Sequence, residues 1–245
     1  MTSPVTAQGH VSTAVAEGIA TVRFGHPKGN SLPGALLGRL AAAVDEVAAV
    51  DEARVVVLRS DGSGPFCAGA SFDELRAIRD AAAGKEFFMG FARLILAMRR
   101  CPKPVVARVH GKAVGGGVGL VAAADYALAH ASASVKLSEL AVGIGPFVVG
   151  PAIERRIGTG AFAALALDTD WRDAAWAERH ALFARVFPTV EELDAAVDAL
   201  AARLKAVLWA DAPPWDDLLE RRAEMSGALV LSDFTRRAIE EFTKG

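Results

Sequence analysis

Two short apolar runs constrain the fold of this chain more strongly than any other feature of its sequence. Arg54–Arg59 holds four consecutive apolar residues between its two arginines, and Pro104–Val109 is similarly short and apolar. A strand that does not alternate apolar with polar residues is buried on both faces, which is typical of a parallel sheet covered by helices. Apolar residues at helical spacing separate the two runs, from Leu32 to Val50 and from Phe72 to about Met98. The sequence therefore predicts an α/β fold built on a parallel sheet.

The remaining segments extend this alternation of strands and helices. Val11–Val15 and Ile19–Phe24 flank Glu17–Gly18 and predict a β-hairpin. The helical stretch after Phe72 is expected to break near Gly84. Further strands are expected at 126–129, 134–137 and 184–187, and further helices at 115–124, 148–157, 161–167, 172–180, 190–207, 214–224 and 231–242.

Composition and charge exclude several classes of function. The 27 Lys and Arg residues against 29 Asp and Glu residues give a net charge of −2 at pH 7, which provides no long-range attraction for nucleic acid or an anionic membrane. No apolar stretch reaches the ~20 residues of a membrane span and no secretory leader is recognisable, so we expect a cytoplasmic protein. Cys67 and Cys101 are too few for a disulfide framework, and no Cys/His spacing indicates a zinc site.

Three glycine-rich turns that follow strand-like segments give the first indication of chemistry. They are Cys67–Ala70, Val114–Gly117 and Ala141–Gly145. Free backbone N–H groups at such turns, supported by a helix dipole, can stabilise an oxyanion in a shared cavity. Close packing of the backbone also requires glycine, and for each turn taken alone this structural explanation is the favoured one.

A dinucleotide site is the competing interpretation of the second turn. Gly117–Ala122 matches the fingerprint G-x-G-x-x-A, and Glu139 lies 20 residues beyond Gly119, at the spacing of the acidic residue that binds ribose. However, residues 110–114 separate the strand from the first glycine, where the fingerprint needs an immediate turn. The residues alone leave the oxyanion and dinucleotide interpretations open.

Glu139 is the candidate acid–base residue. It is the only carboxylate between Tyr126 and Phe147, and its neighbours Leu137 and Leu140 are apolar. Desolvation raises the pKa of such a carboxyl group toward values that suit proton transfer. A helix cap or an ion-pair partner is the structural alternative.

Six motifs in order along the chain resemble the crotonase superfamily of enoyl-CoA hydratases and isomerases. They are Asn30–Leu32, Phe66–Ala70, Pro102–Ala107, His110–Gly117, Asp125, and Ser138–Leu140 with Gly143–Pro146. The resemblance implies a core of β-β-α turns in a right-handed spiral over residues 11–190. It further implies a C-terminal helical oligomerisation region at 191–245, and the residues before Val11 predict a flexible N-terminal tail at 1–10. An ordered set of motifs is more specific than one fingerprint and displaces the dinucleotide interpretation.

The resemblance also implies a site and a ligand. The N–H groups of Ala70 and Gly116 are expected to hold the thioester carbonyl of an acyl-CoA, with Glu139 as the catalytic base. No cofactor beyond the CoA of the substrate is implied, and a homotrimer or dimer of trimers is expected. Residues expected to lie along the substrate are Asn30, Ser31, Leu32, Ala68 and Gly119, with Phe242–Lys244 of a neighbouring subunit over the nucleotide.

One departure from the family pattern bears on the reaction. Hydratases resembling this chain carry a second glutamate where Gly119 stands, and that glutamate helps to activate water. A single base suffices to move a double bond, so the sequence favours a Δ3,Δ2-enoyl-CoA isomerase. Hydration with Asp73 or Glu74 as substitute carboxylate, and acyl-CoA binding without catalysis, are the alternatives.

Overall fold

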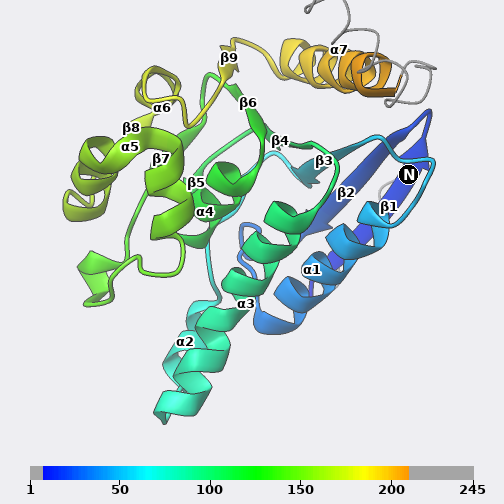
Figure 1. Ribbon diagram of the computed structural model, residues 1–245. Coiled ribbons are helices and arrows are strands. Elements are labelled where there is room, and N and C mark those ends of the chain that lie inside the picture. Colours follow the sequence, from blue (N-terminus) through cyan, green and yellow to red (C-terminus); the bar gives the residue numbers. More distant parts are fainter. Residues whose placement is uncertain (1–7, 210–245) are drawn as a thin grey trace, which may run out of the picture. The chain divides into compact units, whose positions relative to one another are not determined.

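A computed structural model describes residues 8–209 of the chain (Figure 1). The strands are β1 (His10–Ala16), β2 (Ile19–Gly25), β3 (Val55–Ser60), β4 (Val105–Val109), β5 (Ala113–Val114), β6 (Tyr126–His130), β7 (Ser134–Lys136), β8 (Arg172–Asp173) and β9 (Arg185–Phe187). The helices are α1 (Gly34–Ala48), α2 (Phe72–Ala77), α3 (Ala81–Arg100), α4 (Gly116–Ala123), α5 (Gly150–Leu167), α6 (Ala174–Arg179) and α7 (Val190–Trp209), with a 3-10 turn, η1 (Leu140–Val142).

The chain divides into two units, residues 1–206 and 207–245, and the strands above belong to the first. The helices expected at 214–224 and 231–242, the segment Phe242–Lys244 and most of the expected N-terminal tail lie outside the described residues. The proposed oligomerisation role of 191–245 therefore stays a prediction.

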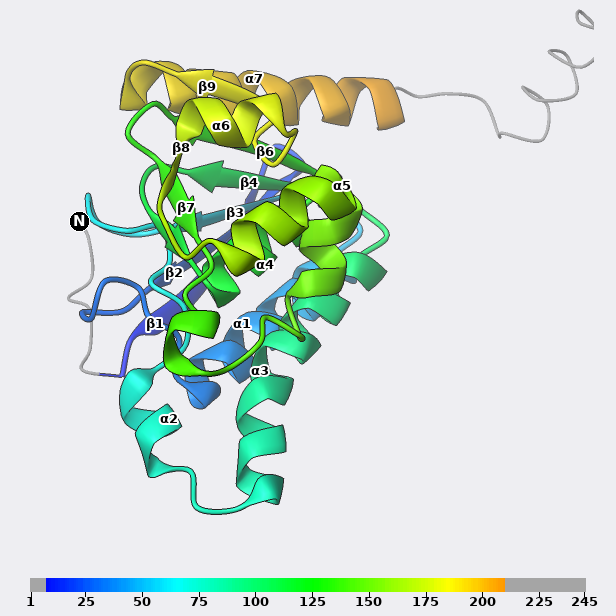
Figure 2. The same cartoon turned by 90° about the vertical axis from the view of Figure 1, so that its left-hand side faces the viewer.

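The larger sheet confirms the parallel arrangement that the apolar runs predict. Its strand order is β1-β2-β3-β4-β6-β9, and every pair after the β1–β2 hairpin is parallel. The hairpin turns at Glu17 and Gly18, whose φ angles of 50° and 78° are both positive, as a tight two-residue turn requires. Figure 2 shows β2, β3 and β4 as adjacent strands with α1, α3 and α4 on one side.

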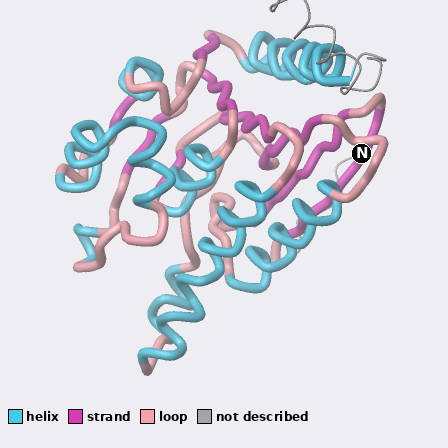
Figure 3. The backbone as a smooth tube through the Cα atoms, in the orientation of Figure 1, coloured by secondary structure: helices cyan, strands magenta, loops and turns pink. Residues whose placement is uncertain are grey.

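Short strand segments form a second, smaller sheet. The three-stranded sheet β5-β7-β8 is extended by single parallel bridges between Cys67 and Ala113 and between Leu32 and Ala70. After β2, β3, β4 and β6 the chain therefore passes through a short strand or bridge and then into a helix, which is the expected β-β-α repeat. Figure 3 shows helices on two sides of the strands in the part of the chain that the structure describes.

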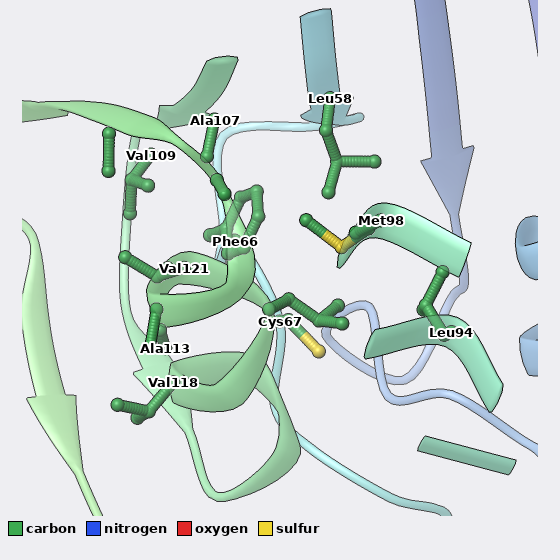
Figure 4. Packing of buried hydrophobic residues seen from close by; sticks show 14 of the residues in the cluster. Leu58, Phe66, Cys67, Leu94, Met98, Ala107, Val109, Ala113, Val118 and Val121 are labelled. Carbon is green, nitrogen blue, oxygen red and sulfur yellow. The ribbon is translucent and has the colours of Figure 1, made fainter. Parts of the chain in front are cut away.

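Two apolar clusters cover the two faces of the larger sheet. On one face, Phe66 and Cys67 are fully buried among side chains of α3 and α4, including Leu94 and Val118 (Figure 4). On the other face, Leu193 and other residues of α7 pack on the apolar residues of β3, β4 and β6. Burial on both faces explains why β3 and β4 do not alternate.

The break in the second helical stretch lies earlier than the sequence predicts. The helix is interrupted at Ile78–Asp80 and resumes as α3, because the Asp80 carboxylate accepts a hydrogen bond of 2.8 Å from the Ala83 N–H. Gly84 lies inside the first turn of α3, so the expectation of a break there was wrong. An aspartate followed by three alanines outweighs one glycine in setting the helix start.

Candidate functional site

The two glycine-rich turns that follow β3 and β4 lie side by side because short backbone hydrogen bonds tie them together. Cys67 donates its N–H to the Lys112 carbonyl at 3.1 Å, and Val114 donates to the Cys67 carbonyl at 2.9 Å. Gly69 has a φ of 88°, and a Cβ there would lie 2.9 Å from the Val114 carbonyl oxygen. Only glycine permits both this backbone conformation and this close approach.

Ala70 and Gly116 each offer a free backbone donor at these turns. Gly116 begins α4, so its N–H has no acceptor one helical turn earlier. Neither N–H donates a hydrogen bond to any acceptor among residues 8–209. Both residues line the same cavity, so the structure brings together the two donors that the sequence predicts. Two unpaired N–H groups in an apolar cavity can bind a developing oxyanion.

The cavity has a volume of about 230 Å³ and is almost entirely apolar. Its residues come from the turn after β3, α2, α3, the turn before α4, and the loop that follows β7. They are Ala68, Gly69, Ala70, Phe72, Leu75, Phe87, Phe88, Phe91, Val114, Gly115, Gly116, Ser138, Glu139, Val142, Ile144, Gly145, Pro146, Phe147, Val148 and Val149. Among the residues that the structure describes, Glu139 is therefore the only ionisable side chain that lines this cavity.

Glu139 lies against the second donor turn. A Cβ on Gly115 would be 3.0 Å from the Glu139 Oε1, and Gly115 has a positive φ of 52°. The Oε2 atom is buried and has no hydrogen-bond partner among the described residues. Burial raises the pKa of Glu139 above its ordinary value, while the backbone N–H groups of Glu139 and Ser138 oppose the shift in part. The predicted direction of this shift is confirmed, and neither of the expected structural alternatives, a helix cap or an ion pair, applies.

Three of the expected substrate residues support the turns and do not line the cavity. Asn30 is buried with a φ of 57°; its Oδ1 accepts from the His26 N–H, and its Nδ2 donates to carbonyls of the 61–65 loop. Leu32 is fully buried and donates its N–H to the Gly69 carbonyl at 2.8 Å. Ser31 lies between them. Ala68 does line the cavity.

The structure corrects the expectation that Gly119 lies along the substrate. It is buried in α4, and a Cβ there would lie 2.6 Å from the Cγ1 of Val149 and 3.4 Å from Ile95. Val149 itself lines the cavity, so Gly119 lies behind the wall. Gly117 is equally close to the Cys67 carbonyl, at 2.6 Å from an added Cβ. Gly117 and Gly119 allow α4 to pack closely against neighbouring segments. This packing accounts for the match to the dinucleotide fingerprint, and no nucleotide site is needed to explain it.

The two candidate substitute carboxylates face away from the cavity. Asp73 is exposed and pairs with the ammonium group of Lys28, which holds the pKa of Asp73 below its usual value. The Glu74 Oε2 accepts a hydrogen bond of 2.8 Å from the N–H of Gly34, the first residue of α1. Neither carboxylate lines the cavity.

Part of the aromatic lining was missed by sequence reasoning. Leu75, Phe87, Phe91 and Val148 line the cavity, whereas Ile78 does not. Phe72, Phe88 and Phe147 were overlooked, and helical spacing gave a signal only for Phe88, which lies three residues before Phe91. Among the described residues, no cluster of ligands suits a metal ion, and no helix is long and apolar enough to cross a membrane.

Comparison with known proteins agrees with this geometry. Residues 14–211 match the family described as enoyl-CoA hydratase/isomerase. The (7aS)-7a-methyl-1,5-dioxo-2,3,5,6,7,7a-hexahydro-1H-indene-carboxyl-CoA hydrolase of Rhodococcus jostii is 36% identical over 132 residues, 54% of this chain and 51% of that protein. The mitochondrial methylglutaconyl-CoA hydratase of Rattus norvegicus is 32% identical over 168 residues, 68% of this chain and 53% of that protein. The matches thus span about half the length of these curated relatives.

Solved structures extend the likeness over nearly the whole chain. An enoyl-CoA hydratase/isomerase family protein from Silicibacter pomeroyi superposes with a TM-score of 0.76 and 29% identity, covering 96% of this chain and 99% of that one. A putative enoyl-CoA hydratase/isomerase (crotonase) from Legionella pneumophila has a TM-score of 0.75 at 24% identity, covers 96% of both chains, and supports the fold alone. The predicted crotonase-like α/β fold is confirmed. The chain belongs to the enoyl-CoA hydratase/isomerase family.

Proposed function

We propose that this protein isomerises 3-enoyl-CoA thioesters to 2-enoyl-CoA thioesters, with Glu139 as the only acid–base group. The observation that carries this proposal is the lining of the cavity, where the described part of the chain places one ionisable side chain, Glu139, next to two unpaired N–H donors. Moving a double bond within the acyl chain needs one base and no water. The reaction requires no metal or redox cofactor.

The proton balance of the reaction fits one carboxylate. Glu139 removes a proton from C2 of the 3-enoyl thioester, and the electron pair moves onto the thioester oxygen to give a dienolate. The N–H groups of Ala70 and Gly116 stabilise this oxygen, each by roughly 3–4 kcal/mol. The neutral Glu139 carboxyl then returns the proton at C4, and the double bond becomes conjugated with the thioester. The raised pKa of Glu139 favours the first transfer, because a carboxylate in an apolar cavity is a stronger base.

Addition or use of water is the second candidate, because the relatives named above are a hydratase and a hydrolase. Such chemistry needs a group that orients and deprotonates water besides the group that handles the carbon acid. Asp73 and Glu74 make contacts outside the cavity, and Val149 occupies the space beside Gly119. The arrangement of these residues therefore favours isomerisation.

An absorbance assay distinguishes the candidates. 3-enoyl-CoA and 2-enoyl-CoA are supplied separately, and the conjugated thioester is followed in each reaction. An isomerase forms conjugated product from the 3-enoyl substrate and consumes none of the 2-enoyl substrate. Loss of conjugation from the 2-enoyl substrate, with ¹⁸O from labelled water in the product, would instead establish hydration. Binding of both thioesters without any turnover would indicate an acyl-CoA-binding protein.

A pair of variants tests whether a water site can be restored. Gly119→Glu alone is expected to gain no hydratase activity, because its side chain would meet Val149. Gly119→Glu combined with Val149→Ala removes that obstacle and serves as the matched comparison. Hydration by the double variant alone would support steric closure of the second carboxylate position. Hydration by wild-type protein would overturn the isomerase proposal.

A further inference from the structure

The cavity is much richer in phenylalanine than the chain as a whole. Five of its twenty lining residues are phenylalanines, whereas the whole sequence has 12 in 245 residues. Phe87, Phe88 and Phe91 come from one face of α3, at the helical spacings that bring side chains together. Phe72 begins α2 and Phe147 lies in the loop before α5, and both are exposed at the edge of the cavity. The part of the site facing α3 is therefore an aromatic wall, defined here as Phe87, Phe88 and Phe91.

Phe91 fixes the inner end of this wall beside the donor turn. Its side chain is only 5% exposed, and a Cβ on Gly116 would overlap its ring. The helix that carries it is held close to α1, because a Cβ on Gly90 would lie 2.9 Å from the Leu37 Cδ1. Phe91 therefore cannot retreat into the core to admit a longer chain, and an acyl group whose carbonyl binds at Gly116 meets an aromatic ring directly.

The size and chemistry of the cavity then limit the acyl group. A cavity of about 150 Å³ lined by Leu, Ile and Phe accommodates benzene, so about 230 Å³ leaves room for one ring and the atoms that join it to the thioester. No Lys, Arg or His within residues 8–209 lines the cavity, and these residues would therefore leave a second carboxylate on the acyl group buried without a partner. Aromatic side chains favour rings through edge-to-face and offset contacts, and Phe87 and Phe88 already lie edge to face at 5.1 Å between centroids.

We infer that the aromatic wall selects uncharged acyl groups that carry a ring over linear acyl groups with the same number of carbons. This inference rests on the proposed acyl-CoA function of the site, but not on isomerisation. A ring also loses less conformational freedom on binding than a flexible chain does, which adds to the preference. Buried apolar area alone would give no such preference, because a linear chain of equal carbon number has at least as much surface.

The test is calorimetric titration of the whole protein with two thioesters of eight acyl carbons, phenylacetyl-CoA and octanoyl-CoA. Neither carries a chain double bond, so binding is measured without isomerisation. We expect phenylacetyl-CoA to bind about fivefold more tightly to wild-type protein, and the ratio to fall toward one in Phe87→Leu and Phe88→Leu. Phe187→Leu is the matched control, because Phe187 packs in the cluster beneath α7 and is not part of the cavity; its ratio should stay at the wild-type value.

Each outcome separates the inference from the function it rests on. Equal binding of both thioesters, or a preference that survives both Phe→Leu changes, would overturn ring selection and leave the acyl-CoA function intact. Failure of both thioesters to bind wild-type protein would overturn the acyl-CoA function and the inference together. Circular dichroism of each variant establishes that it is folded, and the conservative Phe88→Tyr should retain the ring preference where Phe88→Leu loses it.

Discussion

Two carboxylates on opposite faces of the larger sheet have pKa values shifted in opposite directions. Glu139, on the side of α3 and α4, has a buried oxygen without a partner, and burial raises its pKa. Asp194, in α7 on the other face, accepts hydrogen bonds from Arg108, one of them 3.0 Å long, and lies 3.6 Å from Arg59. Burial alone would raise the pKa of Asp194, but the bonds from Arg108 and the charges of both arginines hold it below its usual value.

The contrast separates a reactive group from a structural one. An unpaired carboxylate in an apolar cavity destabilises the folded chain slightly and gains a proton affinity suited to catalysis. A carboxylate bound by two arginines has lost that reactivity and instead holds α7 to the ends of β3 and β4. Both carboxylates are partly buried, so the presence or absence of a charged partner decides the role.

Replacing the unpaired carboxylate should have the largest effect. Glu139→Gln keeps the size of the side chain but removes the base, so we expect the turnover rate for 3-enoyl-CoA to fall about 10³-fold. The dissociation constant for octanoyl-CoA should change little, because the donors at Ala70 and Gly116 remain. Steady-state kinetics and calorimetric titration measure the two quantities. Turnover within tenfold of wild type would mean that another group is the base.

Removing the paired carboxylate of Asp194 should lower the stability of the folded protein and leave its turnover rate unchanged. Asp194→Ala removes the partner of Arg108, whose side chain is 6% exposed, and we expect the free energy of unfolding to fall by about 2 kcal/mol. Asp194 is itself partly exposed, so water compensates some of the loss. Urea denaturation measures the change. Asp168→Ala, which breaks the exposed pair with Arg172, is the control and should cost less. Equal losses in the two variants would contradict the contrast.

Acidification should affect the two carboxylates in opposite directions. The folded-state pKa of Glu139 is raised, so its ionisation penalty grows as pH rises above the unfolded pKa and is relieved as pH falls. The folded-state pKa of Asp194 is lowered, so its stabilisation is present above the unfolded pKa and is lost as pH falls through the folded one. Glu139→Gln should therefore have a higher melting temperature than wild type at pH 7, and the gap should close below about pH 4. A constant gap would contradict the assigned pKa direction.

Ionisation of Glu139 should also determine how the activity depends on pH. The base must be ionised to take the C2 proton, so kcat/KM should fall as the solution is acidified through the pKa of Glu139. Because burial raises that pKa, the midpoint should lie above the ordinary glutamate value of about 4.3. A pH–rate profile with a stable substrate checks this. A midpoint at or below the ordinary value would remove Glu139 from the role of the base.

Sequence reasoning succeeded where a local pattern of residues carries the signal and failed where the outcome depends on contacts between distant segments. The parallel strands, the hairpin and the donor turns follow from apolar runs and glycines, and Glu139 was found because it stands alone among apolar neighbours. Gly119 in α4 is buried behind Val149, the residue that precedes α5. Nothing in the sequence of either segment indicates this contact. For the same reason, Asp73 and Glu74 were candidate bases until the structure placed them on Lys28 and Gly34.

Replacing the exposed carboxylates Asp73 and Glu74 should have the smallest effect on turnover. Asp73 pairs with Lys28 at the surface, and Glu74 binds the first N–H of α1, so each is partnered without being buried. Surface ion pairs of this kind contribute little, and neither side chain reaches the cavity. Asp73→Asn and Glu74→Gln should therefore leave the turnover of 3-enoyl-CoA within about twofold of wild type. A large loss of this turnover in either variant would show that its carboxylate takes part in the reaction despite its contacts outside the cavity, and partner and burial together would then no longer suffice to recognise the catalytic carboxylate.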